Sequence, residues 1–287
     1  MEDYALQVIK LDKSFGKSKI LHDINLTVEK GSVYGLIGQN GAGKTTLLRL
    51  ISGLMRPSGG RIIRHTNKKF IGYMPQSCRF DDNSCVNHTI RFFAGMKHAD
   101  LNESLALCKK LELDVSKKVK HLSPGQQKKL QIVIAMSGDP DFYILDEPTA
   151  GLDPKATFEI MEIIKSIRSN GKSILVSSHI LGDLNEICSH VAIMEKGRLL
   201  HYQKLENSYI VKATPVPYEI LTLLQSRYLI QINGDHTMLT VNGDKNTVSE
   251  LVKELALHSI SVFEVSASNL TTIVHQQLDM RGEESAG

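Results

Sequence analysis

The stretch from Gly38 to Thr46 constrains the fold of this chain more than any other. Its residues, Gly-Gln-Asn-Gly-Ala-Gly-Lys-Thr-Thr, follow an apolar run over 33–37 and lead into residues 47–54, where apolar side chains recur at helical spacing. Strand, glycine loop and helix in this order are the context in which the pattern G-x-x-x-x-G-K-[ST] indicates a phosphate-binding loop. We therefore predict an α/β domain built around this loop.

The residue types of the loop fit the chemistry of a bound triphosphate. Glycines let backbone N–H groups approach the anion, and the helix that begins near Gly43 directs unpaired N–H groups and its positive dipole end to the same place. Lys44 adds a mobile charge, and the Thr45 hydroxyl is a hard ligand for Mg²⁺. The alternative is a glycine-rich turn that fits the pattern by chance.

The composition narrows the class of protein. The chain has 34 basic and 31 acidic residues, a balance that gives no argument for binding nucleic acid or an anionic membrane surface. The four cysteines lack metal-site or C-x-x-C spacing, which indicates reduced thiols in a cytosolic protein. We expect no signal peptide, and no apolar run approaches the roughly 20 residues that cross a bilayer.

Two carboxylates follow an apolar strand predicted at 142–146. Asp146 ends this strand and Glu147 comes next, at the edge where parallel strands present their carboxyl ends to a ligand. There Asp146 can hold Mg²⁺ through water, and Glu147 can orient or deprotonate an attacking water. His179 ends the strand that follows in sequence, so it can reach the γ-phosphate. The alternative for Asp146 and Glu147 is a solvated strand end. The alternative for His179 is an ordinary core or surface histidine.

Residues 122–126, Leu-Ser-Pro-Gly-Gln, open a predicted helix. Ser123 is suited to the N-cap, Pro124 to the first helical position and Gln126 to the third, which makes a capping box. Read locally, the segment is a good helix start and nothing more.

The remaining elements follow the usual signals of periodicity and turns. In the first 205 residues we predict strands at 4–11, 20–28, 61–64, 69–73, 173–178, 190–194 and 198–202, and helical structure at 81–134, 154–169 and 180–188. After residue 205 we predict strands at 208–213, 228–232, 236–241 and 261–265, and helices at 218–227, 247–257 and 268–280. This second order, β-α-β-β-α-β, is the ferredoxin-like arrangement. Residues 281–287 are expected to form a disordered tail.

Taken in order, the glycine loop, Gln76, the 122–126 segment, the 144–148 strand end, Gly151-Leu152-Asp153 and His179 resemble the ATPase subunit of an ABC transporter. The resemblance covers residues 4–205. It implies a P-loop ATPase domain over 1–205 with a mixed sheet, an antiparallel β layer and a helical subdomain inserted at about 81–135. A small α+β domain over 206–280 would follow, as a regulatory or dimer-stabilising appendage.

The resemblance also assigns roles to residues. Glu147 would be the general base, His179 would stabilise the γ-phosphate, and Lys44 and Gln76 would complete the catalytic set. Mg²⁺ would be surrounded by Thr45, Gln76 and Asp146. ATP would be bound by Phe15, Gly38, Asn40, Gly41, Ala42, Gly43, Lys44, Thr45, Thr46, Ser123, Gly125 and Gln126. Phe15 would stack on adenine, and the less favoured alternative is a partly buried surface ring.

Within this family the 122–126 segment contacts ATP held by an opposite subunit, so a second ATPase subunit, identical or paired, is implied. Pro124 departs from the usual glycine and removes one N–H. A separate transmembrane permease is implied as partner, docked between Gln76 and about Gly95. The protein would then lie at the cytoplasmic face of the membrane and drive export of a drug or peptide, as in antibiotic-resistance systems. The rival is a soluble ABC ATPase that acts on a cytosolic assembly. The lysines at 117, 118, 120, 128 and 129 are expected to form a solvated face.

Overall fold

The structure, a computed structural model, describes residues 4–65, 71–185, 187–204, 208–233 and 236–267. The chain forms two compact units, Met1–Gln203 and Lys204–Gly287. The predicted helix at 268–280 and the predicted tail at 281–287 lie outside the described residues, as does the start of the strand predicted at 69–73.

A six-stranded sheet forms the centre of the first unit. Its strand order is β5-β6-β7-β3-β8-β9, and the neighbours from β5 to β8 are parallel. Strands β3, β6 and β7 are buried at every position, as expected for parallel strands that are covered on both faces. The strands are β3 (Val33–Ile37), β5 (Gly72–Met74), β6 (Phe142–Asp146), β7 (Ser173–Ser178), β8 (His190–Glu195) and β9 (Arg198–Lys204).

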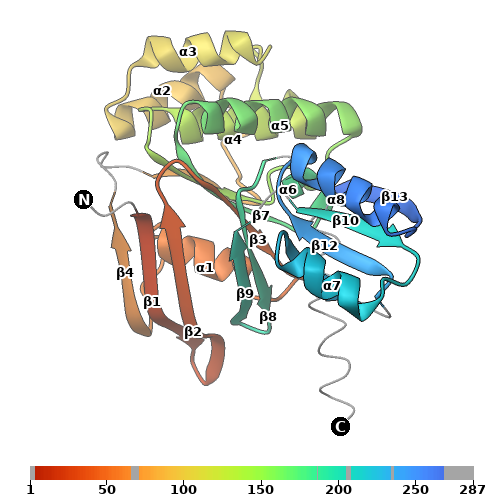
Figure 1. Cartoon of the computed structure of the whole chain (residues 1–287). Coiled ribbons are helices and arrows are strands. Elements are labelled where there is room, and N and C mark those ends of the chain that lie inside the picture. The colour runs from red at the N-terminus through yellow and green to blue at the C-terminus, as the bar shows by residue number, and fades with distance from the viewer. Residues whose placement is uncertain (1–3, 66–70, 186, 205–207, 234–235, 268–287) are drawn as a thin grey trace. The chain divides into compact units, whose positions relative to one another are not determined.

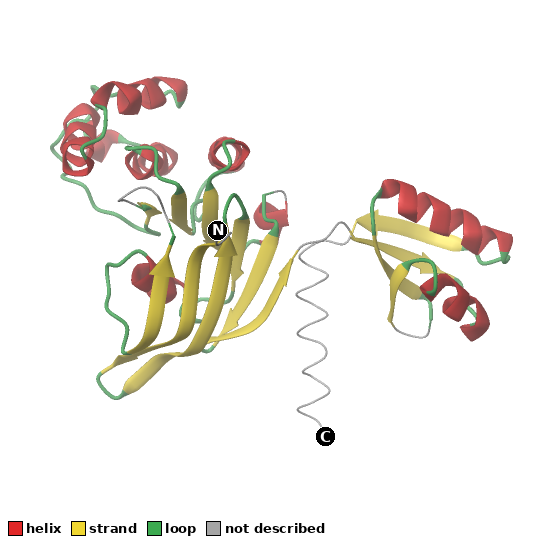
Figure 2. Cartoon of the chain, turned by 60° about the vertical axis from the view of Figure 1, so that its left-hand side comes forward, coloured by secondary structure: helices red, strands yellow, loops and turns green. Residues whose placement is uncertain are grey.

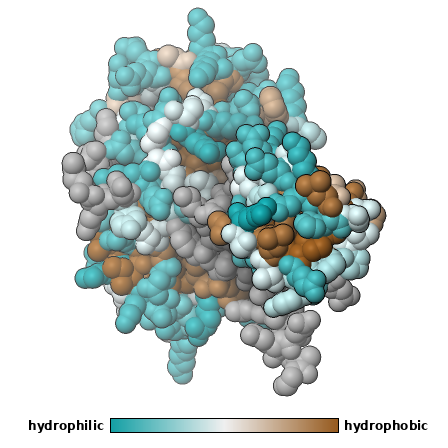
Figure 3. Space-filling view, in the orientation of Figure 1, coloured by the Kyte–Doolittle hydropathy of each residue, from teal (hydrophilic) through white to brown (hydrophobic). Residues whose placement is uncertain are grey.

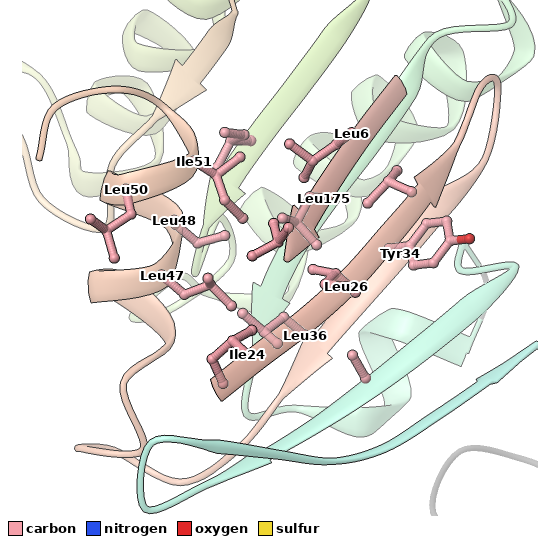
Figure 4. Close-up of a cluster of buried hydrophobic side chains, with 14 of the residues drawn as sticks. Leu6, Ile24, Leu26, Tyr34, Leu36, Leu47, Leu48, Leu50, Ile51 and Leu175 are labelled. Carbon is pink, nitrogen blue, oxygen red and sulfur yellow. The ribbon is translucent and has the colours of Figure 1, made fainter. Parts of the chain in front are cut away.

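An antiparallel sheet of three strands packs against this centre. Its order is β2-β1-β4, with β1 at Tyr4–Phe15, β2 at Ser18–Glu29 and β4 at Gly59–Arg64. Helix α1 (Lys44–Ile51) shares one buried cluster with both sheets, and Figure 4 shows Leu47, Leu48 and Ile51 of α1 beside strand residues of that cluster. Packing thus fixes the helix that leaves the glycine loop.

Three helices form a subdomain with a core of its own. They are α2 (Val86–Lys97), α3 (Leu101–Lys110) and α4 (Pro124–Met136), with a short 3₁₀ turn at Val119–His121 before α4. In Figure 1 they lie together at one end of the first unit, away from the β2-β1-β4 sheet. Helix α5 (Pro154–Ser169) follows β6, and α6 is limited to Leu181–Asn185, shorter than the predicted 180–188. Every helix in the described part of the chain is too short or too polar to cross a bilayer.

The second unit is an antiparallel sheet with two helices on its core. Its elements are β10 (Ser208–Ala213), α7 (Tyr218–Gln225), β11 (Leu229–Asn233), β12 (Met238–Asn242), α8 (Lys245–Leu257) and β13 (Val262–Ala267). The strand order β11-β12-β10-β13 is that of a ferredoxin-like fold, as predicted. Apolar residues of both helices join one cluster with the strands, and Figure 2 shows the two helices over this sheet.

Candidate functional site

The glycine loop connects β3 to α1 and is shaped by close approaches of the backbone. Gly43 is the N-cap of α1 with φ 104°, a conformation that an L-residue with a side chain rarely adopts. A Cβ on Gly38 would lie 2.3 Å from the carbonyl oxygen of Met194 at the end of β8. Gly38 is therefore required by packing within the protein itself, in addition to any approach of a phosphate.

A cavity of about 280 Å³ opens over this loop. It brings the loop together with Gln76, two residues after β5, and with Glu147, directly after β6, as the expected site requires. Of the expected residues, eight line it: Asn40, Gly41, Gly43, Lys44, Thr45, Thr46, Gln76 and Glu147. Ile20 and Gln39 also line it, although the sequence did not single them out.

Asp146 lies behind the cavity wall and is completely buried. The Ser177 hydroxyl, from the neighbouring strand β7, donates a hydrogen bond to its Oδ1 at 2.7 Å. Its Oδ2 is buried and has no hydrogen-bond partner among the described residues. Because a buried carboxylate oxygen without a partner is costly, this atom is an acceptor suited to a Mg²⁺-bound water. The Thr45 hydroxyl and Gln76 would complete an oxygen-rich set of the kind that Mg²⁺ prefers.

Glu147 is held from both sides. Its backbone lies in the left-handed region, with φ 50°, and its N–H donates to the hydroxyl and the carbonyl of Ser177 at 3.0 and 3.2 Å. Its Oε2 lies 2.8 Å from Nδ1 of His179, and its Oε1 forms an ion pair with Lys44 at 3.4 Å that lacks hydrogen-bond geometry. A strained, buried carboxylate that faces two nitrogen groups is a typical arrangement for a catalytic site.

Lys44 has its side chain folded over its own loop. Its ammonium group donates to the carbonyl of Gly38 and reaches that of Gln39 at 3.4 Å. The carbonyl groups and Glu147 therefore hold the cation at the floor of the cavity, where a phosphate would be a stronger, fully charged acceptor.

The 122–126 segment begins α4 as the sequence predicts. The Ser123 hydroxyl accepts from the N–H of Gln126 at 3.2 Å, the Gln126 side chain accepts from the N–H of Ser123 at 3.1 Å, and Pro124 occupies the first helical position. Among the described residues that line the cavity none belongs to 122–126. One copy of the chain thus does not bring Ser123, Gly125 and Gln126 to its own glycine loop.

Phe15 ends strand β1 and is 48% exposed. The Lys13 ammonium lies 4.9 Å from the centre of its ring, a cation–π distance. Phe15 does not line the cavity described above; Ile20, from β2, is the apolar residue that does. The adenine-stacking role of Phe15 stays a prediction.

Lys117, Lys118 and Lys120 are exposed as expected. Lys128 and Lys129 do not belong to this solvated face, and that part of the expectation was wrong. Lys128 is only 8% exposed, and its ammonium donates to the carbonyls of Gln76 at 2.8 Å and Glu147 at 3.2 Å. Lys129 pairs with Glu159 at 2.8 Å and donates to the Leu111 carbonyl. Burial lowers the pKa of Lys128, and the charges of Asp146 and Glu147 oppose that shift. The two lysines face inward because α4 packs against α3, α5 and the loops after β5 and β6.

Ser177 and Lys128, which hold site residues in place from outside the cavity lining, were also not predicted from the sequence. The sequence does contain a signal for Ser177. It lies near the end of a buried strand whose other polar residues are Ser173 and Ser178, and a buried hydroxyl requires a hydrogen-bond partner. The sequence contains no signal for the burial of Lys128, because two adjacent lysines on a helix are most often solvated.

Comparison with known proteins places these features in a family. The family model described as ABC transporter matches residues 21–150. A lantibiotic transport ATP-binding protein of Streptococcus pyogenes is 33% identical over 211 residues, which are 71% of this chain and 92% of that protein. A Nod factor export ATP-binding protein of Cupriavidus pinatubonensis is 28% identical over an alignment 291 residues long, which covers 96% of this chain and 85% of that protein. The solved structure of an ATP-binding subunit of an ABC transporter superposes with a TM-score of 0.63 at 28% identity, over 70% of this chain and 90% of that one.

Proposed function

This chain belongs to the family of ABC transporter ATP-binding subunits, which hydrolyse ATP, and from that premise we propose that it drives export of a drug, peptide or related substrate through a separate membrane permease. The observation that carries the site assignment is the cavity that unites the glycine loop with Gln76 and Glu147. Export as the direction is supported by the Nod factor export relative, and a peptide as cargo by the lantibiotic transport relative.

In the proposed mechanism ATP lies on the glycine loop with its phosphates against the N-terminus of α1. Lys44 leaves the carbonyls of its own loop for the β- and γ-phosphates, because a charge-assisted bond to phosphate is stronger than a bond to a neutral carbonyl. This movement frees Oε1 of Glu147, which then accepts a proton from water, while His179 stays on Oε2. Mg²⁺, held by Thr45, Gln76 and Asp146, would neutralise charge on the phosphates.

A second copy of the chain is proposed to complete the site. The support is that the 122–126 segment, with its helix N-terminus suited to an anion, lies outside the cavity of its own chain. ATP would then hold two subunits together head to tail, and hydrolysis would release them. The exposed apolar side chains of the second unit, among them Leu229, Leu257 and Phe263, support a dimer-stabilising or regulatory role for residues 206–280, and Figure 3 shows apolar surface on this unit.

Helix α2 is the proposed contact with the permease. Phe92 and Met96 are 60% and 61% exposed on this helix, which follows the loop that begins at Gln76. Two large apolar side chains one turn apart on a helix are suited to pack against a partner helix. The same loop carries Gln76 into the cavity, so the contact would be linked directly to the nucleotide.

Turnover of ATP by the full chain tests the site assignment. The Glu147→Gln variant is expected to lose about 10²- to 10⁴-fold in kcat, the usual contribution of a general base. Glu162→Gln, which alters an exposed carboxylate paired with Lys165 on α5, is the matched control and should keep its rate. Equal turnover by wild type and Glu147→Gln would contradict the role of Glu147.

Co-purification tests the partner. Tagged full chain is recovered from detergent-solubilised membranes, and a multi-spanning protein in near-stoichiometric amount is the expected companion. Phe92→Ser with Met96→Ser should lose it, whereas Phe158→Ser, which alters a side chain 65% exposed on α5, should retain it. Recovery of soluble assembly factors alone would favour the rival function, a soluble ABC ATPase.

A further inference from the structure

One buried cation joins the helical subdomain to two loops of the nucleotide cavity. The Nζ atom of Lys128, on α4, donates to the backbone carbonyls of Gln76 and Glu147 at 2.8 and 3.2 Å. These carbonyls follow β5 and β6, which are adjacent parallel strands. A single ammonium group therefore ties α4 to both residues that turn their side chains toward the cavity.

The contact with Glu147 falls on a strained part of the backbone. Glu147 has φ 50°, and such a conformation persists only where its surroundings hold it. Ser177 holds its N–H from β7 and Lys128 holds its C=O from α4. The peptide groups on the two sides of the Glu147 Cα are thus fixed by different elements, and only one of these elements belongs to the sheet.

We propose that Lys128 is a positioning residue for ATP hydrolysis, which fixes the backbone of Gln76 and Glu147 and thereby the direction of the Glu147 carboxylate. The inference rests on the proposed role of Glu147 as the base. It deepens that role, because Lys128 lies one turn into the helix that Ser123 caps. An anion that binds at this N-terminus would therefore contact the same rigid element that holds Glu147.

Removal of the ammonium group is the first test. Lys128→Met keeps most of the aliphatic volume and is expected to lower the kcat of the full chain about 10- to 100-fold, the range that a small misplacement of a catalytic group produces. The KM for ATP should change by less than about threefold, because Lys128 does not line the cavity and a change confined to kcat reports loss in the transition state. Lys128→Arg keeps N–H donors and should recover most of the loss.

The neighbouring lysine supplies a matched control. Lys129 on the same helix is also an inward-facing cation, but its bonds go to Leu111 and Glu159 and not to the cavity loops. Lys129→Met should lower the thermal midpoint about as much as Lys128→Met and keep kcat within about threefold of wild type. Equal loss of kcat in the two variants, or a Lys128→Arg protein as slow as Lys128→Met, would overturn the proposal.

Amide hydrogen exchange tests the clamp without any need for turnover. In Lys128→Met the amides of Glu147, Thr149 and Ser77 should exchange about tenfold faster than in wild type, whereas those of 38–46 should not change. Unchanged exchange at Glu147 and Thr149 would overturn the proposal while Glu147→Gln could still abolish turnover. Conversely, a fully active Glu147→Gln protein would refute the proposed base, and the exchange result would still decide whether Lys128 holds this loop.

Discussion

His179 lies directly on the carboxylate of Glu147, with 2.8 Å between Nδ1 and Oε2. The Glu147 side chain is buried, and the His179 side chain, from the end of the next strand, is half exposed and covers it. The histidine expected at the γ-phosphate therefore has a first partner within the protein. Because Nδ1 of His179 contacts Glu147, Nε2 is the ring atom that can contact a phosphate.

Two amide substitutions separate these roles of His179. Asparagine places its N–H₂ near the position of Nδ1, and glutamine places its N–H₂ near that of Nε2. We expect His179→Asn to retain about tenfold more kcat than His179→Gln, because the bond to Glu147 would orient the proposed base. Steady-state ATP turnover of the two full-length variants, compared with His179→Ala, measures this. The reverse order of activity would mean that the phosphate contact dominates.

Ser177→Ala should weaken the response to Mg²⁺. The substitution removes the donor to Oδ1 of Asp146 and one of the two acceptors of the Glu147 N–H. A ligand carboxylate without its supporting hydrogen bond typically loses about 10- to 100-fold in metal affinity. The Mg²⁺ concentration for half-maximal turnover should rise accordingly. Ser178→Ala is the control, since among the described residues the Ser178 hydroxyl bonds to the backbone of Ile180 alone, accepting from its N–H and donating to its C=O. An equal shift in both variants would count against the assignment.

Pro124→Gly should change ATP turnover by less than about tenfold. Proline at the first helical position removes an N–H that has no acceptor within the helix, and the capping box of Ser123 and Gln126 is intact beside it. A rise in activity of more than about tenfold on Pro124→Gly would show that the missing donor matters to phosphate.

Gly125 has a reason to be glycine that is independent of any ligand. A Cβ at this position would lie 3.0 Å from the Cβ of Ala156 on α5. Gly125→Ala should therefore lower the thermal midpoint, and Ala156→Gly in the same chain should restore it. Suppose that Gly125→Ala also abolishes ATP-dependent association. If association returns in the double variant, Gly125 is required only for packing against Ala156. If association stays lost while the midpoint recovers, the ATP of the second subunit requires a residue without a side chain at this position.

Elements that depend on residues close together in sequence could be predicted from the sequence. The apolar run of β3 and the Ser123 capping box each depend on neighbours in sequence, and the structure confirms both. The β-α-β-β-α-β order likewise predicted the antiparallel sheet of the second unit, because that order has few ways to pack its apolar faces.

The misses concern partners that are distant in sequence. Lys128 points inward because carbonyls after β5 and β6 meet α4, and no pattern around Lys128 announces these acceptors. Gly38 is excluded from carrying a side chain by Met194, more than a hundred residues away. Each of these features depends on tertiary contacts, which are known only once the fold is known.

Lys97 provides a prediction about stability and pH. It is the last residue of α2, and its ammonium donates to the Ile134 carbonyl and lies 3.4 and 3.5 Å from those of Ala135 and Ser137, at the end of α4. Burial lowers the pKa of Lys97 from 10.5 to about 8. Between these values the unfolded chain binds more protons at this site than the folded chain, so the free energy of unfolding rises with pH in that window.

The effect appears as a difference between wild type and Lys97→Met. Below about pH 8 both states of wild type carry the charge, and the difference in unfolding free energy should be constant. From about pH 8 to pH 10 wild type should gain on the order of 2 kcal/mol relative to the variant, as the folded lysine loses its proton and keeps an N–H donor for the carbonyls. Chemical denaturation followed by circular dichroism at each pH measures it. A difference that stays flat up to about pH 10 would mean that the three carbonyls hold the charged form as well as water does.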